Sequence, residues 1–192
     1  MRIIAGSARG RVIEAPRGEH TRPTTDRIRE SVMSSVISCR GSFEGTHVCD
    51  AFAGSGALAL EALSRGAESA TLCDIDKEAL ATIRKNVHSL GFDEQACVLA
   101  CDVLKRGIPR GREPFDVIFL DPPYATLPDA IEHLLANACT SGILASDCLI
   151  SYEHDARVDK VAVDDLARAC ELDHIRTKQY GQTIVDYLIR QG

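Results

Sequence analysis

The segment Phe115–Tyr124 combines a buried strand with groups that can bind a flat amine. Residues 117–120 form an uninterrupted apolar run, which is typical of a strand covered on both faces. Asp121 then places a carboxylate at the carboxyl end of that strand. Pro122 and Pro123 have no N–H group, so the strand ladder ends there and the turn is stiffened. A carboxylate, a backbone carbonyl without a competing N–H, and the aromatic ring that follows suit a planar amide or amine.

Length and composition favour one domain with a small appendage. The chain has 192 residues, of which 45% are hydrophobic, enough for a packed core. No apolar run approaches the roughly 20 residues that a membrane span needs. The first residues lack the apolar region of a signal peptide. We therefore expect a soluble cytoplasmic protein without a membrane partner, and the lack of a long apolar stripe favours a monomer.

The eight cysteines predict reduced thiols in the core. None forms a Cys-x-x-Cys pair, and only Cys97 and Cys101 are close in sequence. Most lie in apolar, strand-like contexts, where cysteine behaves as a small hydrophobic residue. The alternatives are a zinc site or a disulfide framework. We expect no metal.

Charge is distributed unevenly along the chain. The formal net charge is −6, yet residues 1–40 hold eight arginines against four acidic residues, whereas the remainder holds 14 basic against 24 acidic residues. A basic arm on an acidic body can dock locally on phosphates. The alternative is that the arginine excess only forms a solvated surface.

Strand and helix patterns alternate after residue 46. Strands are expected at 47–51, 69–74, 96–101, 115–121 and 147–153, helices at 57–65, 77–90, 128–139 and 161–169, and a terminal strand pair at 170–177 and 183–190. This alternation predicts a doubly wound, mostly parallel α/β sheet of Rossmann-like type. The terminal antiparallel pair would bring it to seven strands.

Residues 1–40 are expected to form an extension before the main domain at 41–192. Residues 2–14 contain two short β-branched runs joined by a glycine-containing link, which predicts a β-hairpin. Apolar residues spaced four apart from Ile28 to Val36 then predict a helix that packs on the main domain.

A glycine-containing loop follows the first expected strand. The run Asp50-Ala-Phe-Ala-Gly-Ser-Gly-Ala57 opens the next helix, and Gly54 and Gly56 permit a tight turn and close approach of a ligand. The third glycine of the dinucleotide fingerprint is absent. Because that glycine serves a pyrophosphate, its absence favours a nucleoside cofactor without one.

The first four expected strands all end in aspartate: Asp50, Asp74, Asp102 and Asp121. Open parallel sheets bind ligands at this edge, and ionised groups there are not explained by core packing. Asp74 follows Gly54 by 20 positions and can accept both ribose hydroxyls of an adenosine group. Asp102 could hold the adenine amine while Val103 packs on the ring. The structural alternative is that Asp74 and Asp76 only cap a helix.

Together these motifs resemble the class I S-adenosylmethionine-dependent methyltransferases that act on exocyclic amino nitrogens. Asp121-Pro-Pro-Tyr124 and the loop from Asp50 to Gly56 carry this resemblance. Three further runs are similar to the RsmD-type family of bacterial 16S ribosomal RNA guanine-N2 methyltransferases: Arg2-Ile-Ile-Ala-Gly6, Thr21–Glu30 and Gly54–Ala67. The resemblance covers nearly the whole chain and is weakest after about residue 155.

The resemblance implies a role for individual residues. Asp121 and the Pro122 carbonyl would accept hydrogen bonds from the target N2 amine, next to Pro123, and Tyr124 would stack on the base. The cofactor S-adenosylmethionine would be lined by Phe52, Ala53, Gly54, Gly56, Asp74, Asp102 and Val103, with Arg22 and Thr24 over it. The partner would be 16S ribosomal RNA, within the small subunit or an assembly intermediate. Candidates for phosphate contacts are Arg2, Arg9, Arg11, Arg22 and the loop at 105–112.

The chemistry agrees with this assignment. The guanine N2 lone pair is delocalised into the ring, so two acceptors that aim it at the sulfonium methyl would act mainly by positioning. The base must leave its stack to enter such a pocket, and aromatic stacking contributes about 1–3 kcal/mol per base. Neither a metal nor a cysteine nucleophile is required. Whether Asp121 also accepts the released proton is open.

Three other interpretations compete with this one. The Asp-Pro-Pro-Tyr motif also fits methylation of adenine N6 in DNA or of a protein glutamine amide, but the N-terminal resemblance and the lack of an added DNA-recognition domain favour RNA. A nicotinamide dehydrogenase fits Gly-x-Gly and Asp74, although the missing third glycine and the Asp121 motif oppose it. A non-catalytic ribosome-binding module is the third, and the intact acceptor set opposes it.

Overall fold

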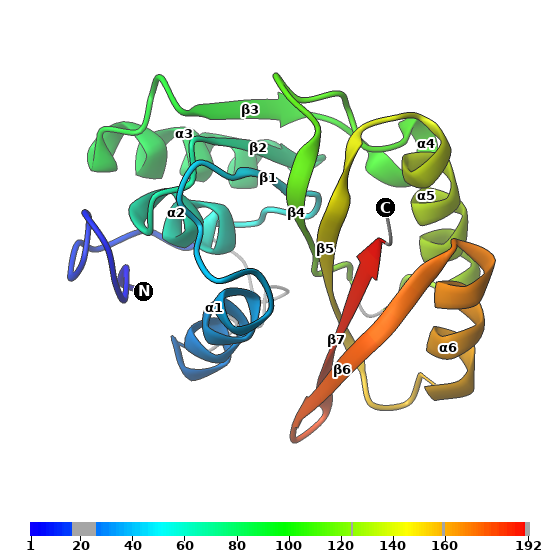
Figure 1. The fold of residues 1–192 in the computed structure, drawn as a ribbon. Helices are drawn as coiled ribbons and strands as arrows, with labels where there is room; N and C mark the ends of the chain where they lie inside the picture. Colours follow the sequence, from blue (N-terminus) through cyan, green and yellow to red (C-terminus); the bar gives the residue numbers. More distant parts are fainter. Residues whose placement is uncertain (17–25, 124, 159, 191–192) are drawn as a thin grey trace.

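The computed structural model describes residues 1–16, 26–123, 125–158 and 160–190 (Figure 1). The helices are α1 (Asp26–Arg40), α2 (Ala57–Ser64), α3 (Lys77–Leu90), α4 (Val103–Arg106), α5 (Pro128–Thr140) and α6 (Lys160–Ala169). The strands are β1 (His47–Asp50), β2 (Ser69–Asp74), β3 (Ala96–Ala100), β4 (Phe115–Leu120), β5 (Leu144–Asp155), β6 (Leu172–Tyr180) and β7 (Thr183–Arg190). Within the described ranges, no helix is long and apolar enough to cross a membrane.

The strands form one seven-stranded sheet in the order β3-β2-β1-β4-β5-β7-β6. The first five are parallel, while β7 runs antiparallel to both β5 and β6. The mostly parallel sheet and its antiparallel C-terminal pair are therefore confirmed. The chain builds outward from β1 to β3 and then crosses to β4. Strand order thus reverses between β1 and β4, and open α/β sheets bind ligands at such a switch point.

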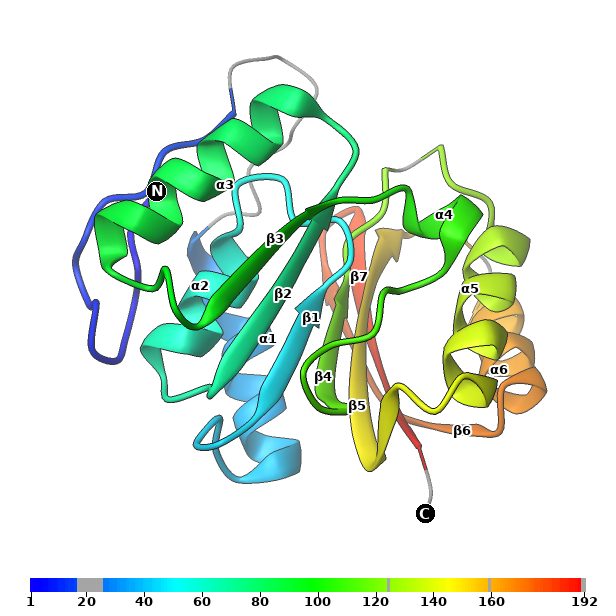
Figure 2. The ribbon, with the colours of Figure 1, turned by 90° about the horizontal axis from the view of Figure 1, so that it is seen from above.

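Helices cover both faces of the sheet (Figures 1 and 2). One hydrophobic cluster joins the sheet to α1, α2 and α3, and the other joins it to α4, α5 and α6. Strand β4 contributes alternately to the two clusters: Val117 and Phe119 face the first, and Ile118 and Leu120 the second. None of the four is more than 1% exposed. The apolar run therefore forms a strand buried on both faces, as expected.

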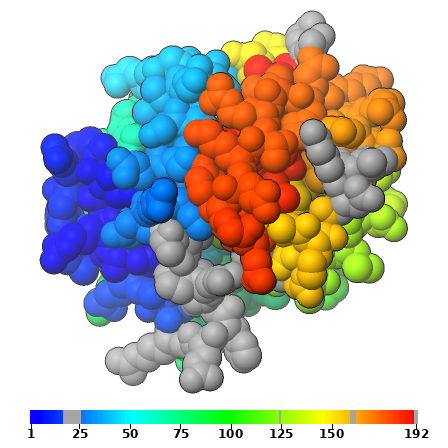
Figure 3. All heavy atoms as spheres, turned by 90° about the horizontal axis from the view of Figure 1, so that it is seen from below, coloured from blue at the N-terminus to red at the C-terminus, as the bar shows by residue number. Residues whose placement is uncertain are grey.

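The N-terminal segment has the antiparallel pairing of the predicted hairpin, although among residues 1–16 this pairing amounts to one bridge and not to two regular strands. Arg2 pairs with Val12 in an antiparallel bridge, and backbone hydrogen bonds such as Ile3 N–H to Arg11 O (3.0 Å) join its two arms. The segment lies against α2, and the Ser7 N–H donates to the Ser64 carbonyl at 2.7 Å. Some of its backbone donors thus serve the opposite arm of the segment, and others serve the neighbouring helix. Figure 3 shows the N-terminal residues beside α1 on one face of the molecule.

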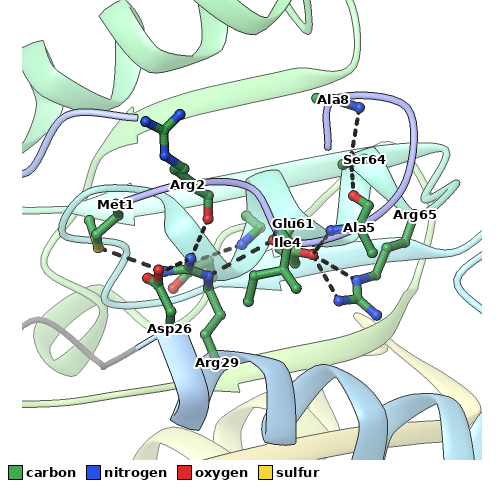
Figure 4. Close-up of polar contacts among 12 residues, drawn as sticks. Met1, Arg2, Ile4, Ala5, Ala8, Asp26, Arg29, Glu61, Ser64 and Arg65 are labelled. Carbon is green, nitrogen blue, oxygen red and sulfur yellow. Dashed lines mark hydrogen bonds and ion pairs between the residues drawn. The ribbon is translucent and has the colours of Figure 1, made fainter. Parts of the chain in front are cut away.

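A buried polar cluster holds this segment in place (Figure 4). The Glu61 carboxylate accepts hydrogen bonds from the backbone N–H groups of Ile4 (2.8 Å) and Ala5 (2.9 Å). It also pairs with Arg65 at 2.8 Å and lies 3.9 Å from the Arg29 guanidinium. The side chains of Arg29 and Glu61 are both fully buried. Because two backbone amides and the Arg65 guanidinium bond to the carboxylate, it can remain in the interior, whereas Arg29 Nε, which faces it, makes no hydrogen bond with the described residues.

Glycine at position 6 is required by this close approach. Its φ is +82°, and a Cβ there would lie 1.7 Å from the Ser64 carbonyl oxygen. The Arg29 guanidinium completes the cluster from α1, donating to the Arg2 carbonyl and pairing with Asp26 at 3.1 Å. The N-terminal segment, α1 and α2 are therefore joined by polar contacts as well as by the apolar core.

Replacing Glu61 by alanine should destabilise the protein by about 3–5 kcal/mol, because it leaves the amides of Ile4 and Ala5 without their acceptor and removes the ion-pair partner of Arg65. Urea unfolding measures this loss. Amide hydrogen exchange at residues 4 and 5 should accelerate in the same variant. The exposed Glu68 on the following turn is a matched control, and Glu68→Ala should change stability by less than about 0.5 kcal/mol. Equal effects of the two substitutions would contradict the role given to Glu61.

Candidate active site

The carboxyl edge of the parallel strands gathers acidic side chains. Strands β1 and β2 end at Asp50 and Asp74, Asp121 directly follows β4, and Asp102 lies two residues beyond β3. Asp50 is in register with Leu72 on β2 and Phe119 on β4, so these ends lie at one level of the sheet. The structure therefore brings the four aspartates to the switch-point edge.

The loop between β1 and α2 is shaped by its glycines. Gly54 and Gly56 have φ values of +55° and +79°, which residues with a Cβ rarely adopt. A Cβ on Gly56 would also lie 3.0 Å from Leu72 Cδ2, beneath the first turn of α2, whereas Gly54 faces open space. The loop thus turns tightly and leaves its backbone open to a ligand. Phe52 is half-buried in the same loop and Ala53 is buried.

Asp74 anchors this loop to β2. One carboxylate oxygen accepts the Gly54 N–H at 2.8 Å, and the other accepts the Asp76 N–H at 2.9 Å. Each oxygen has a second lone pair, so the fixed carboxylate can still accept hydroxyl groups. Asp76 is the N-cap of α3, accepting the Ala79 N–H at 2.8 Å, as the capping interpretation expected for this residue. Asp74 does not cap the helix.

Asp50 is a buried acid held by the start of α2. It is 2% exposed, and its carboxylate accepts the Ala59 N–H at 3.4 Å. Burial raises the pKa of Asp50 to about 7, with further contributions from the negative charges of Asp121 and Asp74. The buried acid is therefore easier to protonate than an exposed aspartate, and a positive charge bound beside it would favour its ionised form.

The adenine-side residues lie at the far end of this edge. Asp102 pairs with Lys105 at 3.0 Å, and that hydrogen bond lowers the pKa of Asp102. Lys105 lies in the short helix α4, where the sequence had suggested a loop. Val103 is buried behind Asp102. Asp102 can bind an adenine amine only if its carboxylate also keeps the bond to Lys105 or if the amine displaces Lys105.

The acceptor motif follows β4 as expected. Asp121 is half-buried, Pro122 is buried and Pro123 is exposed. The Pro123 carbonyl accepts the Thr126 N–H at 2.8 Å, which closes the turn after the motif. Tyr124, the expected stacking residue, lies outside the described residues, and so do Arg22 and Thr24.

Glu153 on β5 also lies at this edge, and it is not among the residues predicted from the sequence. It is 7% exposed. Burial raises the pKa of Glu153 to about 8, and the negative charge of Asp121 contributes in the same direction. An acidic residue in the otherwise buried strand Cys148–His154 is the signal that could have identified it.

The arginines expected to contact phosphates lie at the surface of the N-terminal segment. Arg2, Arg9 and Arg11 are exposed. The Arg2 guanidinium donates to the Gly10 carbonyl at 3.0 Å, and Arg11 donates to the carbonyls that end α3, Leu90 among them. These contacts orient the two guanidinium groups and leave part of each for another acceptor. In the described part of the chain, no group of three potential ligands is placed to hold a metal ion.

A family model described as Conserved hypothetical protein 95 matches residues 1–189. The chain belongs to this family. The "Putative rRNA methyltransferase YlbH" of Bacillus subtilis is 35% identical over the full length of both chains. The ribosomal RNA small subunit methyltransferase D of Escherichia coli is 36% identical over 157 residues, which cover 81% of this chain and 75% of that protein. The resemblance stated from the sequence is therefore confirmed at the level of the family.

A solved structure agrees with this family membership. The "Putative methyltransferase yhhF" of Escherichia coli superposes with a TM-score of 0.79 at 31% identity. The match covers 100% of this chain and 98% of the other. This Conserved hypothetical protein 95 member thus shares its whole fold, from the N-terminal segment to the antiparallel C-terminal pair, with a solved relative.

The raised pKa of Glu153 predicts a pH-dependent cost of folding. Its folded pKa of about 8 exceeds its ordinary value of 4.5, so the stability linked to its neutral form is complete below pH 4.5 and lost as pH rises towards 8. Relative to wild type, Glu153→Gln should gain more than about 1 kcal/mol of stability between pH 5 and pH 8. Urea unfolding of both proteins at the two pH values measures this gain. A difference that is independent of pH would contradict the burial of an acid at this position.

Proposed function

We propose that this protein transfers a methyl group from S-adenosylmethionine to the exocyclic N2 of a guanine in 16S ribosomal RNA of the small subunit. The observation that carries the proposal is the Asp121-Pro122 turn at the switch point, beside the Gly54 loop and Asp74. One ligand bound along the strand ends would meet all of these groups. Relatives named as ribosomal RNA small subunit methyltransferase D support the substrate class.

The residues of the edge fit this cofactor. Bound S-adenosylmethionine supplies a methyl group on a positively charged sulfur. The pKa values of Asp50 and Glu153 are raised first by burial and then by neighbouring acids, so a positive charge bound at this edge would favour their ionised forms. Asp74 would accept the ribose hydroxyls, the Gly54 backbone would approach the methionine part, and Asp102 would take the adenine amine. The missing third glycine agrees with a cofactor that has no pyrophosphate.

The acceptor turn would position the nucleophile. Asp121 and the Pro122 carbonyl each accept one hydrogen of the target amine, which turns the nitrogen lone pair towards the methyl carbon. Pro122 has no N–H, so no donor of its own competes at this point of the turn. Proximity and orientation supply most of the acceleration. Asp121 is also the nearest named acceptor for the proton that the amine loses.

The N-terminal residues would bring RNA to this edge. Residues 1–40 carry the arginine excess, and Arg2, Arg9 and Arg11 are exposed on the segment that α2 holds. Phosphate contacts position a nucleic acid without reading its sequence. The segment would therefore act as an RNA contact, with Arg22 and Thr24 extending over the cofactor as a lid. Such an enzyme acts in the cytoplasm, where ribosomal RNA is assembled, and would work as a monomer.

Replacing Asp121 by alanine should lower the rate of methyl transfer by at least about 100-fold and leave the Kd for S-adenosylmethionine within about threefold, because the residue positions the amine rather than the cofactor. Radiolabelled S-adenosylmethionine with 30S particles, naked 16S RNA or DNA measures transfer, and nucleoside analysis identifies the product. Label on guanine N2 of ribosomal RNA is the expected result for wild type. Label on adenine or on protein would contradict the proposed substrate.

Asp74 and Asp76 form a matched pair for testing the cofactor site. Asp74→Ala should raise the Kd for S-adenosylmethionine by more than about 10-fold, since it removes the ribose acceptor and the tie to the Gly54 loop. Asp76→Ala should cost about 1 kcal/mol of stability through loss of the α3 cap and leave the Kd nearly unchanged. Titration calorimetry and urea unfolding separate the two effects. Equal changes in Kd would show that Asp74 has no special role in binding.

A further inference from the structure

Glu153 lies beside the acceptor turn on the neighbouring strand. Strands β4 and β5 are parallel, and Leu120 is in register with Tyr152. Asp121 and Glu153 are the next residues on the two strands. Adjacent strands are about 4.8 Å apart, so Asp121, just beyond the end of β4, and Glu153, still within β5, are neighbours. Their electrostatic coupling agrees with this placement, because the charge of Asp121 helps to raise the pKa of Glu153.

Glu153 is buried without a structural partner that explains it. The residue is 7% exposed, and among the described residues no side chain or backbone N–H donates a hydrogen bond to its carboxyl group. The other buried acids among the described residues have partners: Asp50 accepts the Ala59 N–H, Glu61 accepts two backbone amides and Arg65, and Asp186 is bonded to His154, His174 and Thr177. The Glu153 oxygens are not among the fully sealed atoms that lack a partner in the described part of the chain, so this largely buried carboxyl group keeps an opening through which a ligand can reach it. Its position next to Asp121 indicates that its partner is the substrate.

The edge of guanine offers a matching donor. Its ring N1–H stands directly beside its N2 amine, so guanine presents adjacent donors to two acceptors side by side. Adenine instead places the acceptor N1 beside its N6 amine, and a glutamine amide places a carbonyl oxygen beside its nitrogen. A carboxyl group has an accepting oxygen in both its neutral and its ionised form. Two acceptors on neighbouring strands therefore fit guanine better than either alternative.

We propose that Glu153 accepts a hydrogen bond from the ring N1–H of the target guanine while Asp121 and the Pro122 carbonyl hold its N2 amine. This inference rests on the proposed function and adds to it a residue that selects guanine. Sites built to bond a substrate N–H reject analogues that lack it, because a buried polar group is then left unpaired. Glu153 thus acts on the orientation and choice of the base and does not contact the cofactor.

The first test compares Glu153→Ala and Glu153→Gln on the RNA substrate that wild type methylates. The alanine variant should lose about 10- to 100-fold in kcat/KM, the range expected for one hydrogen bond to a charged or buried group. The glutamine variant should stay within about threefold, because its amide carbonyl still accepts the N1–H. Both should bind S-adenosylmethionine within about twofold of wild type. Ser151→Ala, two residues earlier on the same strand, is the control and should leave kcat/KM within about twofold.

The second test removes the donor from the substrate. In a synthetic RNA segment that wild type methylates, the target guanine is replaced by 1-deazaguanine, which keeps the N2 amine and carries C–H in place of N1–H. Wild type should lose about the same factor in kcat/KM as Glu153→Ala loses on guanine, and the variant should lose little more on the analogue. If the loss from Glu153→Ala and the loss from the analogue do not add, Glu153 and the guanine N1–H contact each other directly.

The outcomes separate this inference from the proposed function. If wild type places no label on guanine N2, the proposed function fails and Glu153 loses its assigned partner. If wild type labels guanine but Glu153→Ala retains kcat/KM within threefold, the inference alone is overturned. Equal losses by the alanine and glutamine variants, or independent losses from the variant and the analogue, would also overturn it.

Discussion

Parallel pairing of β4 with β1 on one side and β5 on the other is the constraint on which the site depends. It places Asp121 between Asp50 and Glu153, two buried acids whose pKa values are raised by burial and by Asp121. Placing three acidic side chains this close together opposes folding. Such a cluster is typical of a site where a ligand brings a positive charge or hydrogen-bond donors. A sulfonium cofactor on one side and a base with adjacent N–H donors on the other would supply both.

Helix α2 joins the two halves of the proposed function. Its first residues follow the Gly54–Gly56 loop, which Asp74 ties to β2. Its later residues, Glu61 and Ser64, hold the N-terminal segment through backbone amides. The loop proposed to bind the cofactor and the segment proposed to contact RNA are thus fixed to one rigid, fully buried helix. Their relative position is set by polar contacts that the apolar core alone would not specify.

Much of this arrangement follows from local sequence patterns. The order of strands and helices, the Asp76 cap of α3 and the convergence of the strand-end aspartates need only periodicity and the geometry of parallel sheets. The pairing of the two N-terminal arms was predicted, but their attachment to α2 was not, because the Ile4 amide bonds to Glu61, 57 positions away, and no local pattern reveals that partner. The place of Glu153 in the site was not predicted for a similar reason, because its proximity to Asp121 depends on the register between β4 and β5.

The central claim is that one ligand spans the carboxyl ends of β1 to β4 with its reactive end at the acceptor turn. A crystal structure with S-adenosylhomocysteine, the demethylated cofactor, tests it most directly. The account predicts ribose oxygens within hydrogen-bond distance of Asp74 and a sulfur that faces the Asp121–Pro122 turn. A nucleoside bound away from this edge, or one whose sulfur points away from Asp121, would contradict it.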